Sequence, residues 1–559
     1  MTLRPLRRFQ TAVLSIAGLA GLTAAITVFS QTPSQAPAPA PAPNRPRLIL
    51  VVSIDQMRFD YLTRFATLYK GGLKTLLERG AVFTDANYRH SATETGPGHS
   101  VILTGRHPSH SGIVANDWYD SYQRRFVNVV DDPVQATIGG TGRSASPANA
   151  MSFTVGDVLK SKSPQSIVVG VSQKDRSAIL MGGRRADAAY WYEVAGGNFI
   201  SSTYYMREAP AWLVAWNNRH IGDSYAGKSW TRLLPDTALY EKYAGPDHVD
   251  GEWDRKDTVF PHVLRGKPPE RLFYDDLRRT PYSDEMTLEF AFEAMKAHRL
   301  GEDSTTDIFA VGFSSTDVIG HTYGSDSQET MDQLLRLDLV LEKLFKEIDS
   351  RVGLANTLVV MTADHGSLPL VEALKAKGVD AQRAAPAVLQ TAAKQALDQR
   401  FGIIENLFVY SAPDFYFNEE TMRLRQIDRK DAEAVAIEAL MRTGLVEKVY
   451  THADLTNTAP ASDPFLPLFR NSFYAPRSPH LNVLLKKYVY MSSLVGGTGH
   501  GTAYDYDRHV PIVFMGSGVK PGQYNQPSGP EDIAPTLALM LGLEFPREAD
   551  SRLLSEMLR

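Results

Sequence analysis

The sequence predicts an α/β protein in which a mostly parallel central sheet carries helices on both faces. Five apolar runs rich in β-branched residues indicate the strands, and none alternates between polar and apolar residues, so each is expected to be buried on both faces. Stretches with apolar residues at helical spacing separate the runs, which favours a layered arrangement. The five runs are LILVVSI (48–54), SIVVGVS (166–172), IFAVGFS (308–314), TLVVMTA (357–363) and VPIVFMG (510–516).

Two of the predicted helices are especially clear. The segment 330–348, TMDQLLRLDLVLEKLFKEI, has apolar residues at helical spacing and charged residues on the opposite side. The segment 531–543, EDIAPTLALMLGL, begins with acidic residues, which the partial positive charge of a helix N-terminus favours. Both are expected to pack against the sheet.

The chain is predicted to consist of an export signal, a linker and one large domain. Residues 1–30 carry arginines and then an uncharged apolar run, as a signal peptide does, and residues 31–46 form a Pro/Ala-rich linker. The domain would span 47–559, with capping insertions at about 177–285 and 367–480. A periplasmic or secreted protein is therefore expected, while retention of the apolar run as a membrane anchor stays open.

The composition narrows the classes of partner and of chemistry. The chain of 559 residues has a formal net charge of −4, which provides no basic field for a nucleic-acid partner. It contains no cysteine, which excludes disulfides, thiolate catalysis and cysteine-based zinc sites. Nothing in the sequence indicates a protein partner.

Polar residues lie next to the predicted strands, at the edge where open α/β sheets bind their ligands. A single aspartate after a strand is usually a helix cap, and an aspartate four residues before a histidine is usually a surface pair. Carboxylates that gather at one edge, however, repel one another and lose hydration, and a cation offsets both costs. Imidazole and carboxylate ligands favour zinc, with manganese or iron left open, and their number favours two metals. The residues are Asp55, Asp317, His321, Asp364, His365 and His500.

Six strings in the mature part of the chain carry a family resemblance. They are SIDQMRFDYL, TETGPGHSVILTGRHPSHSGIVANDWYD, STDVIGHTYG, TADHG, GGTGHGTAYDYDRHVPIVFMG and DIAPTLALMLGL. In content and in order they resemble the alkaline phosphatase superfamily, which implies an alkaline phosphatase-like fold and a phosphate ester hydrolase with two zinc ions per chain. The resemblance also implies that one zinc is held by Asp55, Thr95, Asp364 and His365, and the other by Asp317, His321 and His500.

Thr95 stands before Gly-Pro-Gly in the string TETGPGHS (93–100). The resemblance implies that the Thr95 hydroxyl is the nucleophile and becomes phosphorylated. A helix N-terminus is expected there, where free backbone N–H groups favour an anionic phosphoryl group. Sulfatases of this fold have a cysteine or serine at the nucleophile position, which becomes formylglycine, and an arginine shortly after it. A threonine cannot form this aldehyde and the arginine is missing, so a sulfatase is not expected.

Three further residues indicate to which branch of the superfamily the chain is similar: Asn116, Lys174 and Arg176. Asn116 matches an asparagine of nucleotide pyrophosphatase/phosphodiesterases, whereas Lys174 and Arg176 resemble the pair found in phosphate-irrepressible, PafA-like bacterial alkaline phosphatases. In that branch the two cations contact the non-bridging oxygens of a monoester. We therefore expect an exported alkaline phosphatase that hydrolyses phosphate monoesters with broad specificity through a phosphothreonine, with Asn116, Lys174 and Arg176 binding the substrate.

Other interpretations stay open at this stage. A phosphodiesterase or nucleotide pyrophosphatase is the main alternative, a phosphonate hydrolase would use the same metals, and a zinc- or phosphate-binding protein is the alternative outside enzymes. Glu94 is either a solvated neighbour of Thr95 or a contact to the substrate. His99, His107 and His110 are expected to orient the backbone or to pack, and the aromatic segment 190–206 to fill a core or an insertion.

Overall fold

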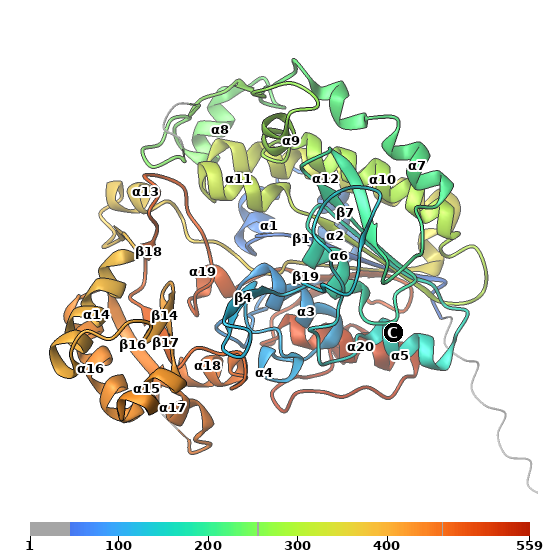
Figure 1. Cartoon of the computed structure of the whole chain (residues 1–559). Coiled ribbons are helices and arrows are strands. Elements are labelled where there is room, and N and C mark those ends of the chain that lie inside the picture. Colours follow the sequence, from blue (N-terminus) through green and yellow to red (C-terminus); the bar gives the residue numbers. More distant parts are fainter. Residues whose placement is uncertain (1–44, 254–256, 461) are drawn as a thin grey trace, which may run out of the picture. The chain divides into compact units, whose positions relative to one another are not determined.

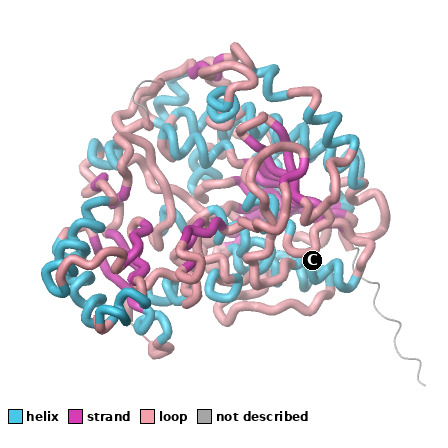
Figure 2. The backbone as a smooth tube through the Cα atoms, in the orientation of Figure 1, coloured by secondary structure: helices cyan, strands magenta, loops and turns pink. Residues whose placement is uncertain are grey.

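A sheet of ten strands organises the fold of the computed structural model, which describes residues 45–253, 257–460 and 462–559 (Figures 1 and 2). At its centre, five neighbouring strands run parallel in the order β12-β1-β11-β6-β7. The central strands are β1 (Leu48–Ile54), β6 (Val168–Ser172), β7 (Ala188–Glu193), β11 (Asp307–Phe313) and β12 (Thr357–Thr362).

Further strands extend the sheet on both sides and make it mixed. On one side β19 pairs antiparallel with β12, followed by β2 and β20, and on the other side β8 and β5 continue antiparallel from β7. The five predicted runs therefore all form strands, and the predicted α/β class is confirmed. The outer strands are β2 (Ala81–Phe83), β5 (Thr137–Ile138), β8 (Asn198–Ser202), β19 (Ile512–Gly516) and β20 (Gly522–Tyr524).

Alternate residues of β1 explain why the strand is apolar throughout. Leu48, Leu50 and Val52 belong to one hydrophobic core, whereas Ile49 and Val51 belong to a second core on the other face. All five side chains are fully buried. Each such side chain contributes about 1.5–3 kcal/mol on burial, so both faces must be covered by helices.

Helices cover each face of the sheet. The first core packs on α2 (Gly72–Arg79), α10 (Tyr282–His298) and α12 (Gln328–Arg351). The second packs on α3 (Thr95–Thr104), α5 (Val155–Lys162) and α20 (Ile533–Leu541). The helices predicted over 330–348 and 531–543 are thus confirmed as α12 and α20, the latter preceded by the turn η3 (Pro530–Asp532).

The range 177–285 is not one insertion, because its first part belongs to the sheet as β7 and β8. The aromatic residues there fill the core: Tyr190 and Phe199 are buried and lie against Phe290 of α10. The layer outside the sheet begins after β8. It contains α7 (Ala211–Asn217), η1 (Ile221–Tyr225), β9 (Ser229–Trp230), α8 (Thr237–Ala244), β10 (His262–Val263) and α9 (Arg271–Leu277).

A second group of elements, residues 382–491, is named the cap here (orange at the left of Figure 1). Its sheet, β14-β15-β17-β16, encloses a hydrophobic core of its own with α14 and α16. The expected end at residue 480 is too early, because β17 lies beyond it. The cap contains β13 (Gln382–Ala384), α14 (Ala387–Phe401), β14 (Phe408–Ser411), β15 (Asp414–Phe417), α15 (Glu419–Arg425), α16 (Arg429–Arg442), β16 (Val446–Thr451), α17 (His452–Thr456), α18 (Leu466–Ser472), β17 (Leu481–Leu485) and β18 (Val489–Met491).

The remaining elements connect these layers. They are α1 (Asp60–Arg64), α4 (Pro108–Ser111), β3 (Asp117–Asp120), β4 (Arg125–Asn128), α6 (Asp175–Gly182), α11 (Ser315–Tyr323), η2 (Leu354–Asn356), α13 (Val371–Ala376), α19 (Asp505–Arg508) and η4 (Ser555–Met557).

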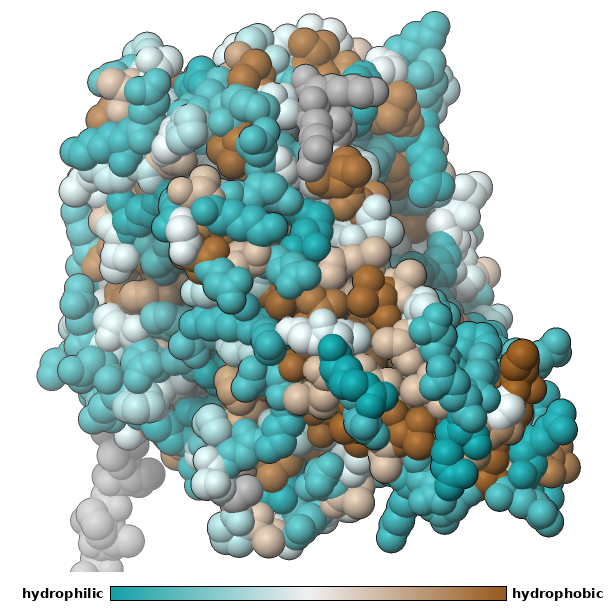
Figure 3. All heavy atoms as spheres, turned by 90° about the vertical axis from the view of Figure 1, so that its left-hand side faces the viewer, coloured by the Kyte–Doolittle hydropathy of each residue, from teal (hydrophilic) through white to brown (hydrophobic). Residues whose placement is uncertain are grey.

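The surface of the protein is mainly hydrophilic on the face that Figure 3 shows, with hydrophobic residues gathered towards its middle and lower right. No helix within the described residues is long and apolar enough to cross a membrane, and the predicted signal peptide lies outside them.

Candidate active site

The carboxyl ends of four neighbouring strands bring the predicted polar residues to one edge of the sheet. Asp55 follows β1, Lys174 follows β6, Asp364 follows β12, and Asp317 lies in α11 just after β11. Since β6, β11, β1 and β12 are adjacent and parallel, their ends meet at this edge. The site therefore lies where the sequence predicts it.

His500 reaches the same edge although it precedes its strand. β19 runs antiparallel to β12, and Ile512 at its start is paired with Thr362 at the end of β12. The segment that leads into β19 therefore ends at the edge where the parallel strands finish. His500 lies in this segment, before α19, and its Nε2 is 3.6 Å from Asp317 Oδ1.

Thr95 is the first residue of α3, and its side chain is almost completely buried. The glycines after it allow α3 to approach β12 closely, because a Cβ at Gly98 would overlap the carbonyl group of Asp364. Free backbone N–H groups are scarcer than expected here. Gly96 donates its N–H to Asn116 Oδ1 (2.7 Å), Pro97 has none, and Gly98 donates to the carbonyl of Glu94 (2.9 Å).

Two cationic side chains surround the Thr95 hydroxyl instead. Lys174 Nζ and Arg176 Nη2 each lie 3.4 Å from Thr95 Oγ1, and both residues stand at the start of α6. Asn116 is fixed on the other side, because its backbone N–H donates to Glu94 Oε2 at 2.7 Å. The four predicted residues Thr95, Asn116, Lys174 and Arg176 are thus brought together.

A first group of potential metal ligands contains Asp55 and Asp364, with His99 beside them. Both carboxylate oxygens of Asp55 are buried, and within the described residues neither accepts a hydrogen bond; the nearest cation is Lys174, whose Nζ lies 3.0 Å from Asp55 Oδ2. Burial alone would raise the pKa of Asp55, but the positive charge of Lys174 and the neighbouring His99 ring hold this pKa below its usual range. A buried, ionised carboxylate beside a second carboxylate fits a cation site.

The second group contains Asp317, His365 and His500, with His321 Nε2 3.2 Å from Asp317 Oδ1. Burial alone would raise the pKa of Asp317, yet Lys174 and His321 hold it well below the usual value. His365 lies between the two groups, because its Nε2 is 3.2 Å from Asp364 Oδ2 and 4.0 Å from Asp317 Oδ1.

The three histidines share one feature that suits metal ligands. Each has its Nδ1 next to a backbone carbonyl: that of Thr498 for His321 (2.7 Å), of Gly366 for His365 (2.9 Å) and of Thr93 for His500 (2.8 Å). A carbonyl only accepts, so each Nδ1 donates and Nε2 keeps its lone pair for a cation.

In the other histidines near Thr95, ring nitrogens lie within hydrogen-bonding distance of protein groups. His99 lies with Nδ1 2.9 Å from the Thr95 carbonyl and Nε2 3.0 Å from Ser53 Oγ, which suits the expected role of orienting the backbone. His107 and His110 face away, towards Asp550 and Glu548 respectively.

Gln56 is a site residue that the sequence patterns do not single out. Its Nε2 donates to Asp317 Oδ1 at 2.9 Å and its backbone N–H donates to Asp364 Oδ1 at 3.0 Å. The backbone of Gln56 is left-handed, with φ of 65°, which turns the side chain across the site. The only signal in the sequence is its position directly after Asp55.

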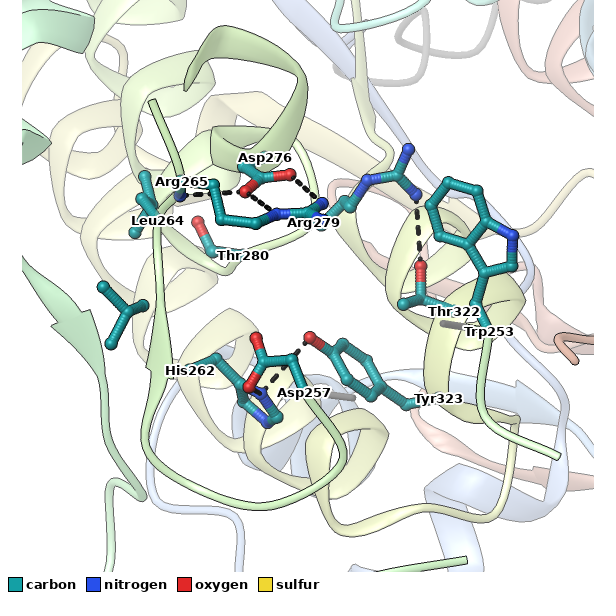
Figure 4. A pocket seen from close by; sticks show the side chains of 11 residues that line it. Trp253, Asp257, His262, Leu264, Arg265, Asp276, Arg279, Thr280, Thr322 and Tyr323 are labelled. Carbon is teal, nitrogen blue, oxygen red and sulfur yellow. Dashed lines mark hydrogen bonds and ion pairs between the residues drawn. The ribbon is translucent and has the colours of Figure 1, made fainter. Parts of the chain in front are cut away.

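Two cavities lie near these residues. The larger, of about 230 Å³, is bordered by Glu94 and His500 and extends to the cap. The smaller, of about 30 Å³, lies beside the end of α11, where Figure 4 shows Asp276 bonded to Arg265 and Asp257 bonded to His262. The smaller cavity has room for about one or two water molecules and not for a substrate.

Comparisons with known proteins agree with this geometry. The model of the type I phosphodiesterase / nucleotide pyrophosphatase family matches residues 49–464. Alkaline phosphatase PhoV of Synechococcus elongatus is 33% identical over 522 residues, which cover 92% of this chain and 93% of PhoV. Alkaline phosphatase PafA of Elizabethkingia meningoseptica is 32% identical over 524 residues, covering 92% of this chain and 95% of PafA.

Solved structures extend the comparison to the fold. The crystal structure of PafA has a TM-score of 0.86 at 31% identity, over 92% of this chain and 99% of that chain. A PafA variant in which a threonine, an asparagine, a lysine and an arginine are substituted has a TM-score of 0.85. The chain therefore belongs to the type I phosphodiesterase / nucleotide pyrophosphatase family and, like these relatives, is an alkaline phosphatase.

Proposed function

We propose that this alkaline phosphatase is an exported, zinc-dependent enzyme that hydrolyses phosphate monoesters through a phosphothreonine at Thr95. The observation that carries the proposal is the position of the Thr95 hydroxyl, 3.4 Å from both Lys174 Nζ and Arg176 Nη2. A hydroxyl between two cations at the edge of the sheet suits a nucleophile that attacks a dianionic phosphoryl group.

The residues present fit two zinc ions. Asp55, Asp364 and His365 with the Thr95 oxygen would hold one, and Asp317, His321 and His500 the other. Support comes from buried atoms that make no hydrogen bond to any described residue, namely both Asp55 oxygens, Asp364 Oδ2 and His365 Nε2. Bound zinc supplies positive charge that lowers the pKa of a hydroxyl ligand and stabilises a departing oxygen.

Hydrolysis of the monoester then proceeds in two displacements at phosphorus. In the first, Thr95 Oγ1 forms a bond to phosphorus as the ester P–O bond breaks, and the proton that the threonine gives up ends on the departing alcohol. In the second, water attacks the same phosphorus from the opposite side, the bond to Thr95 breaks, a proton from the water returns to Thr95 Oγ1, and inorganic phosphate leaves. Lys174 and Arg176, with Asn116, hold the non-bridging oxygens in both steps.

The two cations distinguish a monoesterase from a diesterase. A monoester presents two negative charges and three non-bridging oxygens, whereas a diester presents one charge and blocks one oxygen. Lys174 and Arg176 match the higher charge, which favours the monoester over the diester that the family's name suggests. The substitutions in the PafA variant affect a threonine, an asparagine, a lysine and an arginine, the same four residue types as Thr95, Asn116, Lys174 and Arg176.

The test compares kcat/KM for an aryl phosphate monoester and for its diester, with metal analysis of the same sample. We expect a large preference for the monoester, about two zinc ions per chain by the ligand count, and loss of activity on chelation with recovery on adding zinc. Equal turnover of both esters would refute the monoester assignment, and activity that resists chelation would refute the metal centre. Export is tested by fractionating cells that express the enzyme and by sequencing the N-terminus of the purified protein.

A further inference from the structure

We infer that the larger cavity beside Thr95 takes the leaving group of the substrate, and that its charge favours phosphate esters of amino alcohols over esters with an anionic leaving group. The inference rests on the proposed function, because it assumes that a monoester is cleaved at Thr95. It adds a substrate class: monoesters whose alcohol part carries an ammonium group.

The cavity is placed to receive the alcohol part of a substrate. Its volume is about 230 Å³, and its border includes Glu94, directly before Thr95, and His500. Lys174 and Arg176 lie 3.4 Å from the Thr95 hydroxyl and do not belong to the lining of the cavity, so the cavity is free to receive the ester group. A volume of this order accommodates a small alcohol.

Three carboxylates line the cavity, and among the described residues that line it there is no lysine or arginine. Glu94 comes from the start of α3, Asp117 from β3 and Asp414 from β15 of the cap. Three separate segments therefore contribute negative charge to one cavity. An anionic leaving group would be repelled there, and a cationic one attracted.

Backbone N–H groups fix the positions of two of these carboxylates. Asp414 Oδ1 accepts from the Val483 N–H, and Glu94 Oε2 accepts from the Asn116 N–H, each at 2.7 Å. Burial raises the pKa of Asp414 to about 7. An ammonium group in the cavity would offset the cost of burying this carboxylate.

Aromatic rings in the lining suit the same class of ligand. Phe469, Tyr416 and Tyr490 border the cavity together with the carboxylates. Carboxylates and aromatic faces are the groups that recognise ammonium ions in proteins. Lys174, Arg176 and the proposed zinc ions would supply positive charge at the phosphoryl end, and the carboxylates of the cavity supply negative charge at the other, so the site would orient a substrate that is itself dipolar.

The test uses three monoesters with a two-carbon leaving group and different charge: phosphoethanolamine, 2-hydroxyethyl phosphate and phosphoglycolate. Each is assayed with wild type and with Asp414→Asn at about pH 8.5, where Asp414 is ionised and the ammonium group still protonated. The ratio of variant to wild-type kcat/KM for each ester removes the intrinsic differences in reactivity. We expect Asp414→Asn to lower the preference for phosphoethanolamine over phosphoglycolate about tenfold, with 2-hydroxyethyl phosphate intermediate.

Glu438→Gln is the matched control. It removes one negative charge from α16 of the same cap, where the side chain is exposed and paired with Arg442. The preference should not change in this variant. If Asp414→Asn does not fold, Asp117→Asn removes a carboxylate at the exposed rim of the cavity and should shift the preference in the same direction.

An unchanged preference in a folded Asp414→Asn or Asp117→Asn enzyme overturns the inference, and so does an equal shift in Glu438→Gln. In each case normal hydrolysis of an aryl monoester would leave the proposed function intact. Absence of any monoester hydrolysis by the wild-type enzyme would instead remove the proposed function, and the inference with it.

Discussion

Lys174 and Asp317 form an ion pair at the centre of the site, with Lys174 Nζ 2.6 Å from Asp317 Oδ2. The same ammonium group lies 3.0 Å from Asp55 Oδ2 and 3.4 Å from Thr95 Oγ1. Burial alone would lower the pKa of Lys174, but the charges of Asp317 and Asp55 raise it above the usual value. The side chain therefore stays positive at alkaline pH, next to the nucleophile and to one carboxylate of each proposed metal group.

Replacing Lys174 and Arg176 together with alanine should lower kcat/KM for an aryl monoester about 100-fold or more, because each cation loses a contact to a developing charge. The loss on the corresponding diester should be much smaller, since it carries one negative charge less. Steady-state kinetics with both substrates measure the difference. Arg185→Ala, which removes an exposed positive charge just after α6, should leave both values unchanged. Equal losses on the two substrates would contradict a role in selecting the dianion.

Thr95→Ala should reduce turnover by about three orders of magnitude or more, because the nucleophile is removed. Zinc content should stay close to that of the wild type, since aspartates and histidines supply the other ligands. Thr95→Ser is the control, because it keeps the hydroxyl and should retain measurable turnover. When the wild-type enzyme is quenched with acid during turnover, mass spectrometry should detect a phosphate group on Thr95. Full activity of Thr95→Ala would rule out the phosphothreonine.

The polar residues at the strand ends could be predicted because each depends on a short local pattern. A buried apolar run fixes a strand, and the residue after it must lie at one edge of a parallel sheet. His500 is expected at the same edge because it precedes a predicted strand, and the structure supplies the physical reason, which is the antiparallel pairing of β19 with β12.

The parts that the sequence did not predict depend on long-range packing. β7 contains Tyr190, Trp191 and Tyr192, and these aromatic residues do not form the aliphatic run that predicts a buried strand. The strand is buried because α10 covers it, and this contact cannot be read from the sequence. β16 in the cap, VEKVYT, carries exposed charges and lacks a buried run. Gln56 could not be identified because its partners, Asp317 and Asp364, are distant in sequence.

Gln56→Ala should weaken metal binding about 10- to 100-fold, because Asp317 loses the hydrogen bond that orients it. Titration of the metal-free protein with zinc, followed by calorimetry, gives the affinity independently of activity. Excess zinc should restore most of kcat, which a residue acting on the substrate would not allow. Gln123→Ala, at an exposed position, is the control. Unchanged zinc affinity in Gln56→Ala would show that the hydrogen bond does not support the metal site.

His262 should make the stability of the protein depend on pH. Its side chain is nearly buried, with Nδ1 3.1 Å from Asp257 Oδ1 and Nε2 3.0 Å from Glu329 Oε1 (Figure 4 shows His262 and Asp257). Burial alone would lower the pKa of His262, but the hydrogen bonds to Asp257 and Glu329 raise it to about 9. The folded value lies above the unfolded value of about 6.5, so the contribution is complete below about pH 6.5 and is lost as pH rises through about 9.

His262→Gln should therefore lower the free energy of unfolding by about 1–3 kcal/mol at about pH 6 and by much less at about pH 9.5. Urea unfolding at the two pH values measures both differences. His248→Gln, where the side chain is 58% exposed, should show little dependence on pH. A loss of equal size at both pH values would mean that His262 is neutral in the folded protein, and that its contacts with Asp257 and Glu329 are hydrogen bonds without a charge.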